Sequence, residues 1–184
     1  MKPNKKTLLP TIVLGAICLV VALLLATVNL VTKGVIEEND RLALERSLAE
    51  ALPSEEGYEE IGITEPMRAA AAAASPQKIT VTHIYRERGG NGYVVTLENR
   101  SGYTGKPIAI TVGIDGAGIV TRALITRNPE TKNTKEMAAY PDTFSGKNEE
   151  QVKDAELVAG VTRTSTAFRF GVAAAIAAVG AIGQ

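Results

Sequence analysis

A glycine followed by hydroxyl side chains opens the last apolar segment of the chain: residues 159–165 read AGVTRTS. Glycine permits close approach of the backbone to a ligand, and the free N–H groups at the start of a helix bind phosphate well. A threonine hydroxyl at such a place can also be esterified by a phosphate. The pattern indicates a site for a tethered, phosphate-bearing cofactor. The simpler alternative is a glycine turn before a helix capped by Thr164 or Ser165.

The N-terminal part of the chain has the composition of a membrane anchor. Leu8–Val31 carries no charge, and as a helix it would be about 36 Å long, enough to cross a hydrocarbon core of about 30 Å. Residues 1–7 contain three lysines, and acidic residues follow the apolar run at 37–40. The positive-inside rule then predicts a cytoplasmic tail at 1–7, a transmembrane helix at 8–32 and an extracytoplasmic remainder in a plasma membrane. A cleaved signal peptide is the alternative, although its apolar core is usually only about 7–15 residues long.

Residues 33–77 are predicted to form a helical stalk and a linker. Leucines spaced among charged residues at 35–52 indicate a helix that continues the membrane segment, and Pro53 ends the pattern. Four further prolines or glycines and an alanine run occupy 53–77. We expect an irregular connection there with at most a short helix.

Residues 78–184 are predicted to form one α+β domain. Four apolar or alternating stretches, near 79–84, 93–97, 107–114 and 119–126, are separated by turns rich in Gly, Asn and Asp. They predict an antiparallel sheet with one buried face. Short helices are expected at 134–139 and 148–152, and a longer one up to about Val179, whose apolar stripe consists of Phe168, Val172, Ala175, Ile176 and Val179.

Composition excludes several classes of function. Lys plus Arg equals Asp plus Glu at 20 each, so the net charge does not indicate a nucleic-acid partner. The chain has a single cysteine, Cys18, inside the apolar run, and a single histidine, His83. These counts argue against an internal disulfide, a Cys or His metal site and a His-based catalytic triad.

Motifs spread over nearly the whole chain match one family. They are NLVTK at 29–33, Gly-Tyr pairs at 92–93 and 102–103, GKPI at 105–108, the strand 110–115 and VTRTSTAF at 161–168. On these motifs the chain resembles the G subunit of the Rnf electron-transport complex. It is more distantly similar to the C subunit of the sodium-pumping NADH:quinone reductase. Both carry a membrane-anchored FMN-binding domain, which the resemblance places at 78–184.

The resemblance implies a covalent attachment site for FMN. The family motif is Asp-x-x-Ser/Thr-Gly-Ala-Thr, and its last threonine is esterified to the FMN phosphate. Here the acceptor position is Thr162 and the glycine is Gly160, while Glu156 stands at the acidic position. Ala159 and Val161 replace the family's hydroxyl residue and alanine.

The resemblance also implies contacts to the flavin ring. The family's loop His-x-Glu-Thr-Pro-Gly-Leu-Gly corresponds to residues 128–133, which read NPETKN. Its conserved part predicts that Glu130 and Thr131 bond the isoalloxazine edge. The predicted cofactor-binding residues are thus Thr162, Gly160, Val161, Arg163, Thr164, Ser165, Glu130 and Thr131.

By resemblance, the chain would be the FMN-carrying electron-transfer subunit of an ion-translocating ferredoxin:NAD oxidoreductase complex. Its partners would be the other membrane subunits, membrane lipid and an FAD:protein FMN transferase that modifies Thr162. No side chain of its own would be catalytic or hold a metal. Two alternatives stay open at this point: a family member that binds FMN only reversibly or not at all, and an unrelated single-pass extracellular sensor or adhesion domain.

Overall fold

The structure is a computed structural model that describes residues 5–100, 102–132 and 134–183. The chain forms two compact units, Met1–Leu44 and Glu45–Gln184. A single continuous helix, α1 (Lys5–Ala51), makes up the described part of the first unit and enters the second. The predicted anchor and the predicted helix at 35–52 are therefore one element.

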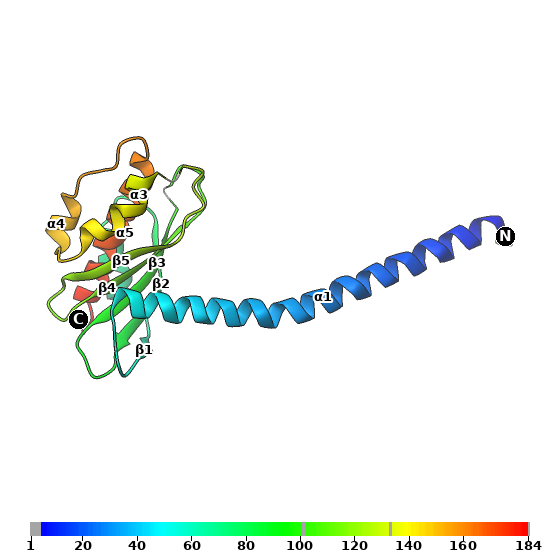
Figure 1. Ribbon diagram of the computed structural model, residues 1–184, viewed down its shortest axis with the longest axis horizontal. Helices are drawn as coiled ribbons and strands as arrows, with labels where there is room; N and C mark the ends of the chain where they lie inside the picture. Colours follow the sequence, from blue (N-terminus) through cyan, green and yellow to red (C-terminus); the bar gives the residue numbers. More distant parts are fainter. Residues whose placement is uncertain (1–4, 101, 133, 184) are drawn as a thin grey trace. The chain divides into compact units, whose positions relative to one another are not determined.

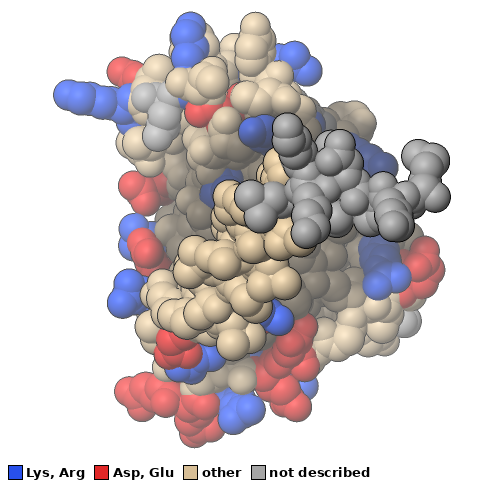
Figure 2. All heavy atoms as spheres, turned by 90° about the vertical axis from the view of Figure 1, so that its right-hand side faces the viewer, with Lys and Arg blue, Asp and Glu red and all other residues tan. Residues whose placement is uncertain are grey.

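In the first unit, α1 is long and apolar enough to cross a membrane. Large hydrophobic side chains are exposed on all sides of it from Ile12 to Ile36. Figure 2 is viewed from the side of the N-terminus, and the atoms of this helix that are not grey appear largely tan, the colour of residues other than Lys, Arg, Asp and Glu. An all-round apolar surface of this length is typical of a helix surrounded by lipid.

The second unit is built on a five-stranded sheet in which each strand pairs antiparallel with the next one along the chain (Figure 1). The strands are β1 (Tyr58–Ile61), β2 (Ile79–Glu87), β3 (Tyr93–Asn99), β4 (Ile108–Ile114) and β5 (Val120–Arg127). The four strands predicted from residue 78 onward are confirmed, as is the α+β class.

The edge strand β1 lies in the segment for which an irregular connection was expected. Glu59 and Glu60 at its centre are both exposed, so the strand has no apolar alternation that would distinguish it from a loop. Its backbone hydrogen bonds to β2 make it a strand instead. The helix α2 (Glu65–Ala73) contains most of the alanine run. Both elements belong to the second unit, which thus begins well before residue 78.

One face of the sheet is covered by helices. The C-terminal helix α5 (Thr162–Gly180) packs on β3 and β4, with α2 and α4 (Glu149–Lys153) beside it. Gly171 allows this close approach, because a Cβ there would lie 2.5 Å from Ile110 Cδ1. The short helix α3 (Lys135–Ala139) and the 3-10 helix η1 (Tyr140–Phe144) connect β5 to α4. Phe144, Phe168 and Tyr140 form an aromatic group in this core.

The last turn of α1 contacts the other face of the sheet. Residues alternate between the two faces of a strand, so Gly113 of β4 faces away from α5. The carbonyl of Ala51 lies where a Cβ of Gly113 would be and accepts a hydrogen bond from Thr121 Oγ1 at 2.6 Å. Arg122 adds an exposed ion pair with Glu50 at 3.2 Å. The end of the long helix is therefore fixed to β4 and β5, the last two strands of the sheet.

Candidate functional site

Three segments meet at one end of the sheet, where β3 and β5 end and β4 begins. Asn99, the last residue of β3, pairs with Ile108 at the start of β4, and Ala109 pairs with Arg127 at the end of β5. The antiparallel order therefore brings the β3–β4 turn and the loop after β5 to the same end of the sheet. The buried Asn99 side chain donates to the carbonyl of Ala167 at 2.9 Å. This bond fixes the first turns of α5 at that end of the sheet.

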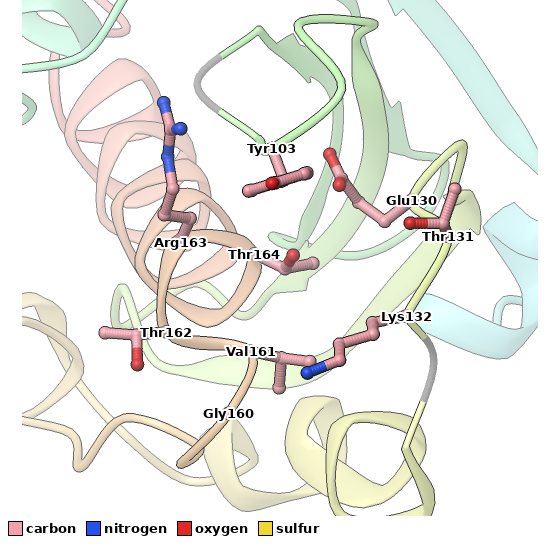
Figure 3. A pocket seen from close by; sticks show the side chains of 9 residues that line it. All are labelled: Tyr103, Glu130, Thr131, Lys132, Gly160, Val161, Thr162, Arg163 and Thr164. Carbon is pink, nitrogen blue, oxygen red and sulfur yellow. The ribbon is translucent and has the colours of Figure 1, made fainter.

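A cavity of about 560 Å³ lies between these segments, a volume in the range of sites for cofactors and other small molecules. Figure 3 shows the side chains that line it. They come from the β3–β4 turn (Tyr103), the loop after β5 (Glu130, Thr131, Lys132) and the start of α5 (Gly160, Val161, Thr162, Arg163, Thr164). Of the eight predicted cofactor-binding residues, all but Ser165 line this one cavity.

The backbone at the start of α5 is arranged by Gly160. Its φ of +79° lies in the left-handed region, where a side chain would be strained. Apart from its chain neighbours, no described residue has an atom within 4 Å of the position of a Cβ at Gly160, so its conformation, and not crowding, explains the glycine. The helix begins at Thr162, with Val161 as its N-cap and without a side-chain cap. The cap expected at Thr164 or Ser165 is therefore wrong, by three or four residues.

Ser165 has a structural role inside the first turn of α5. Its buried hydroxyl accepts from the N–H of Val158 at 3.2 Å and lies 3.1 Å from the carbonyl of Thr162. It ties the preceding loop to the helix and faces away from the cavity lining. Glu156, at the acidic position of the motif, lines a different hollow together with Glu136 and Lys147.

Thr162 and Thr164 lie in contrasting environments. Thr162 is exposed at the rim of the cavity, where another protein can reach its hydroxyl. Thr164 is only 4% exposed, and Figure 3 shows its side chain directed toward Tyr103 and Glu130. Among the described residues, the Thr164 hydroxyl has no hydrogen-bond partner. The side chain is largely buried but its hydroxyl is not fully enclosed, so this group opens to the cavity and is available to a ligand there.

Glu130 is held by the β3–β4 turn. Its two carboxylate oxygens each accept from the N–H of Thr104 at 3.3 Å, and Oε1 also accepts from the Thr104 hydroxyl. A Cβ on Gly102 would lie 2.1 Å from the same carboxylate, so a larger residue there would displace the Glu130 side chain from its present position. Glu130 thus joins two of the three segments that form the cavity.

The structure adds two residues that were not among the predicted ones, Tyr103 and Lys132. Tyr103 is 73% exposed, and the guanidinium of Arg163 lies 5.9 Å from the centre of its ring. Lys132 extends from its loop toward Val161 (Figure 3). The Gly-Tyr pair at 102–103 was noticed as a family motif, but nothing in its local pattern places the ring beside α5. Lys132 lies in the loop that differs from the family pattern.

The cavity has a positive electrostatic balance. The N-terminus of a helix carries about half a positive charge, and α5 directs this end into the cavity beside Lys132 and Arg163. Glu130 is the one acidic residue among the described lining residues, and its carboxylate is engaged by Thr104. An anion in this cavity would be stabilised.

Comparison with known proteins supports the same family. The N-terminal 51 residues match the family model described as the RnfG N-terminal region. The chain is also similar to the G subunit of the Na⁺-translocating ferredoxin:NAD⁺ oxidoreductase complex of Acetobacterium woodii. The two are 27% identical over an alignment of 157 residues, which covers 83% of this chain and 74% of that protein. The N-terminal region, which includes α1, is thus similar to that of RnfG proteins, and the pairwise similarity covers most of the rest of the chain.

Proposed function

We propose that this chain carries FMN as the electron-transferring G subunit of an Rnf-type, ion-translocating ferredoxin:NAD⁺ oxidoreductase complex, with the FMN phosphate esterified to Thr162. The observation that carries the proposal is the cavity at the start of α5. It combines an exposed Thr162, a positive helix end and a largely buried Thr164 whose hydroxyl has no protein partner among the described residues. The named relative from Acetobacterium woodii supports the assignment to such a complex.

The residues present fit a phosphorylated flavin. The N–H groups of the first turn of α5 have no carbonyl acceptor within the helix and suit a phosphate. The exposed Tyr103 ring offers a flat apolar surface for an aromatic ring. Thr164 and Thr131 supply hydroxyl groups on the cavity wall.

Bound FMN supplies one- and two-electron transfer chemistry, which no side chain in the cavity can provide. The contribution of the chain is to bind, orient and retain this group. Thr162 would fix the phosphate covalently, and Thr164 would hydrogen-bond the ligand inside the cavity. Asn99 and Glu130 hold α5 and the two loops in place around it. The α1 anchor would keep this carrier next to the other membrane subunits.

Attachment requires a separate enzyme, because the Thr162 hydroxyl has no general base among its described hydrogen-bond partners. In the proposed reaction, Thr162 Oγ1 forms a bond to the FMN-side phosphorus of FAD. The pyrophosphate bond breaks, AMP leaves and the hydroxyl proton is released. The exposure of Thr162 permits an FAD:protein FMN transferase to reach it.

The charges flanking the apolar part of α1 support a defined orientation. Lysines precede it, and Glu37, Glu38 and Asp40 follow it, so we propose a cytoplasmic N-terminus and an extracytoplasmic sheet domain. A membrane-impermeant maleimide should label Lys106→Cys in intact cells and should not label Lys2→Cys. The reverse labelling pattern would contradict this orientation.

The experiment that tests covalent attachment is the intact mass of the full chain after co-expression with a transferase. The wild type should gain one FMN minus water, and Thr162→Ala should not. Thr164→Ala distinguishes the largely buried threonine from the exposed one and should keep the added mass. Thr166→Ala is a matched control, because Thr166 belongs to the same helix but does not line the cavity.

An unmodified wild-type mass would refute the ester. The alternative of a family member with reversibly bound flavin, or with a structural role only, would then have to be preferred. Added mass that persists in Thr162→Ala and is lost in Thr164→Ala would move the attachment site to Thr164.

A further inference from the structure

Lys132 is a charged residue of the cavity without a role in the folded chain. It lines the cavity, its side chain is exposed, and the described residues include no ion-pair or hydrogen-bond partner for it. Figure 3 shows the chain of Lys132 extending across the cavity toward Val161, the N-cap of α5. A flexible ammonium group in this position lies on the phosphate side of the proposed site.

The neighbours of Lys132 leave its charge uncompensated. The positive end of α5 lies on the same side of the cavity. Arg163 is another cation, whose guanidinium lies over the ring of Tyr103. The carboxylate of Glu130 is directed to Thr104 in the β3–β4 turn. A bound anion would relieve the repulsion among these positive groups.

A second observation, independent of charge, indicates that a ligand occupies this cavity. Thr164 is only 4% exposed, its side chain points into the cavity, and its hydroxyl has no partner among the described residues. The hydroxyl therefore opens to the cavity, where a ligand with polar atoms can hydrogen-bond it. Lys132 and Thr164 lie on different segments, so a ligand that contacts both must span the cavity.

We propose that Lys132 binds the phosphate of the flavin, so that the cavity binds FMN reversibly and in preference to unphosphorylated riboflavin before any ester is formed. This inference rests on the proposed function, since it assigns the phosphate end of that same site. Lys132 and the first-turn N–H groups of α5 hold the phosphate beside Thr162, while Thr164 contacts the remainder of the ligand.

The test uses the full chain in detergent, produced in a host that lacks the transferase, so that Thr162 stays unmodified. Flavin fluorescence measures the affinities for FMN and for riboflavin, with inorganic phosphate as a competitor. Because a hydrogen bond to a charged group has a substantial energy, Lys132→Gln should weaken FMN binding about tenfold. Riboflavin binding should stay unchanged, and Lys132→Arg should retain the preference for FMN. Lys135→Gln is the matched control, since Lys135 is exposed at the start of α3 but does not line the cavity.

Selective loss of FMN affinity in Lys132→Gln, together with competition by inorganic phosphate in the wild type, would establish the inference. Equal weakening of both flavins, no weakening, or a wild type that does not prefer FMN would overturn it. The mass of Lys132→Gln after co-expression with the transferase separates this inference from the proposed function. If Lys132→Gln gains covalent flavin but the wild type shows no preference for FMN in reversible binding, the role of Lys132 is refuted and the proposed ester at Thr162 is retained.

Discussion

Replacing Gly113 by alanine should separate the last turn of α1 from the sheet. The added Cβ would lie 2.1 Å from the Ala51 carbonyl oxygen, 2.5 Å from its carbon and 2.4 Å from Thr121 Oγ1. Two of these are backbone atoms, which cannot rotate away as the end of a side chain can. Either the helix end moves or the strand bends, and in both cases the Thr121–Ala51 hydrogen bond at 2.6 Å is lost.

The expected magnitude follows from these contacts. Overpacking of a close interface costs about 1–3 kcal/mol, and a backbone clash belongs at the upper end of this range. Loss of the hydrogen bond adds about 1 kcal/mol. A total of about 3–4 kcal/mol corresponds to a decrease in Tm of roughly 6–16 °C for a domain of this size.

Thermal unfolding of the full chain in detergent, followed by near-ultraviolet circular dichroism, measures this decrease. The chain has five tyrosines and no tryptophan, and Tyr58, whose hydroxyl donates to the carbonyl of Leu52, reports on the region next to α1. Gly62→Ala is the matched control, because no atom lies within 4 Å of its Cβ position, and its Tm should change by less than about 2 °C. A Gly113→Ala chain as stable as Gly62→Ala would refute the close contact between α1 and β4.

Two further predictions concern the cavity and the core. Glu130→Ala removes the acceptor for the N–H and hydroxyl of Thr104. Amide hydrogen exchange should therefore accelerate in the β3–β4 turn and stay unchanged in α4. Equal exchange rates in this turn for the variant and the wild type would contradict the proposed role of Glu130 in holding the turn. Tyr140→Phe should stabilise the chain or leave it unchanged near pH 7, since the Tyr140 hydroxyl is buried without a partner among the described residues. Burial raises the pKa of Tyr140 to about 12, so ionisation of this phenol does not affect the stability of the wild type below about pH 10, and the stability falls as the pH rises from 10 toward 12. Urea unfolding at pH 9 and pH 11 should therefore show a smaller loss of stability in Tyr140→Phe than in the wild type, and equal losses would contradict the burial of this hydroxyl.

Local patterns were sufficient for the elements whose signal lies within a few residues. The uncharged run of α1, the alternation of β4 and the apolar stripe of α5 are each consequences of burial or lipid exposure along one segment. The sequence NPETKN at 128–133 and AGVTRTS at 159–165 likewise placed Glu130, Thr131 and Thr162 among the candidate residues. These residues do line one cavity, although their joint role in binding FMN stays a prediction.

Other features depended on contacts between distant segments. β1 has no apolar alternation and is ordered by its pairing with β2. The start of α5 was misjudged because Gly160 begins the turn without a side-chain cap.

The amino-acid sequence alone specifies a long apolar helix, a domain of mixed strands and helices, and a glycine and threonine motif before the last helix. Each of these is encoded by neighbouring residues, through hydrophobic periodicity and the conformational freedom of glycine. That Tyr103 and Lys132 face the same cavity as this motif follows from the three-dimensional fold. The fold also determines that Thr164 is buried there while Thr162 is exposed. The physical reason is that antiparallel pairing and the packing of α5 on the sheet bring together segments about 60 residues apart, which no local pattern specifies.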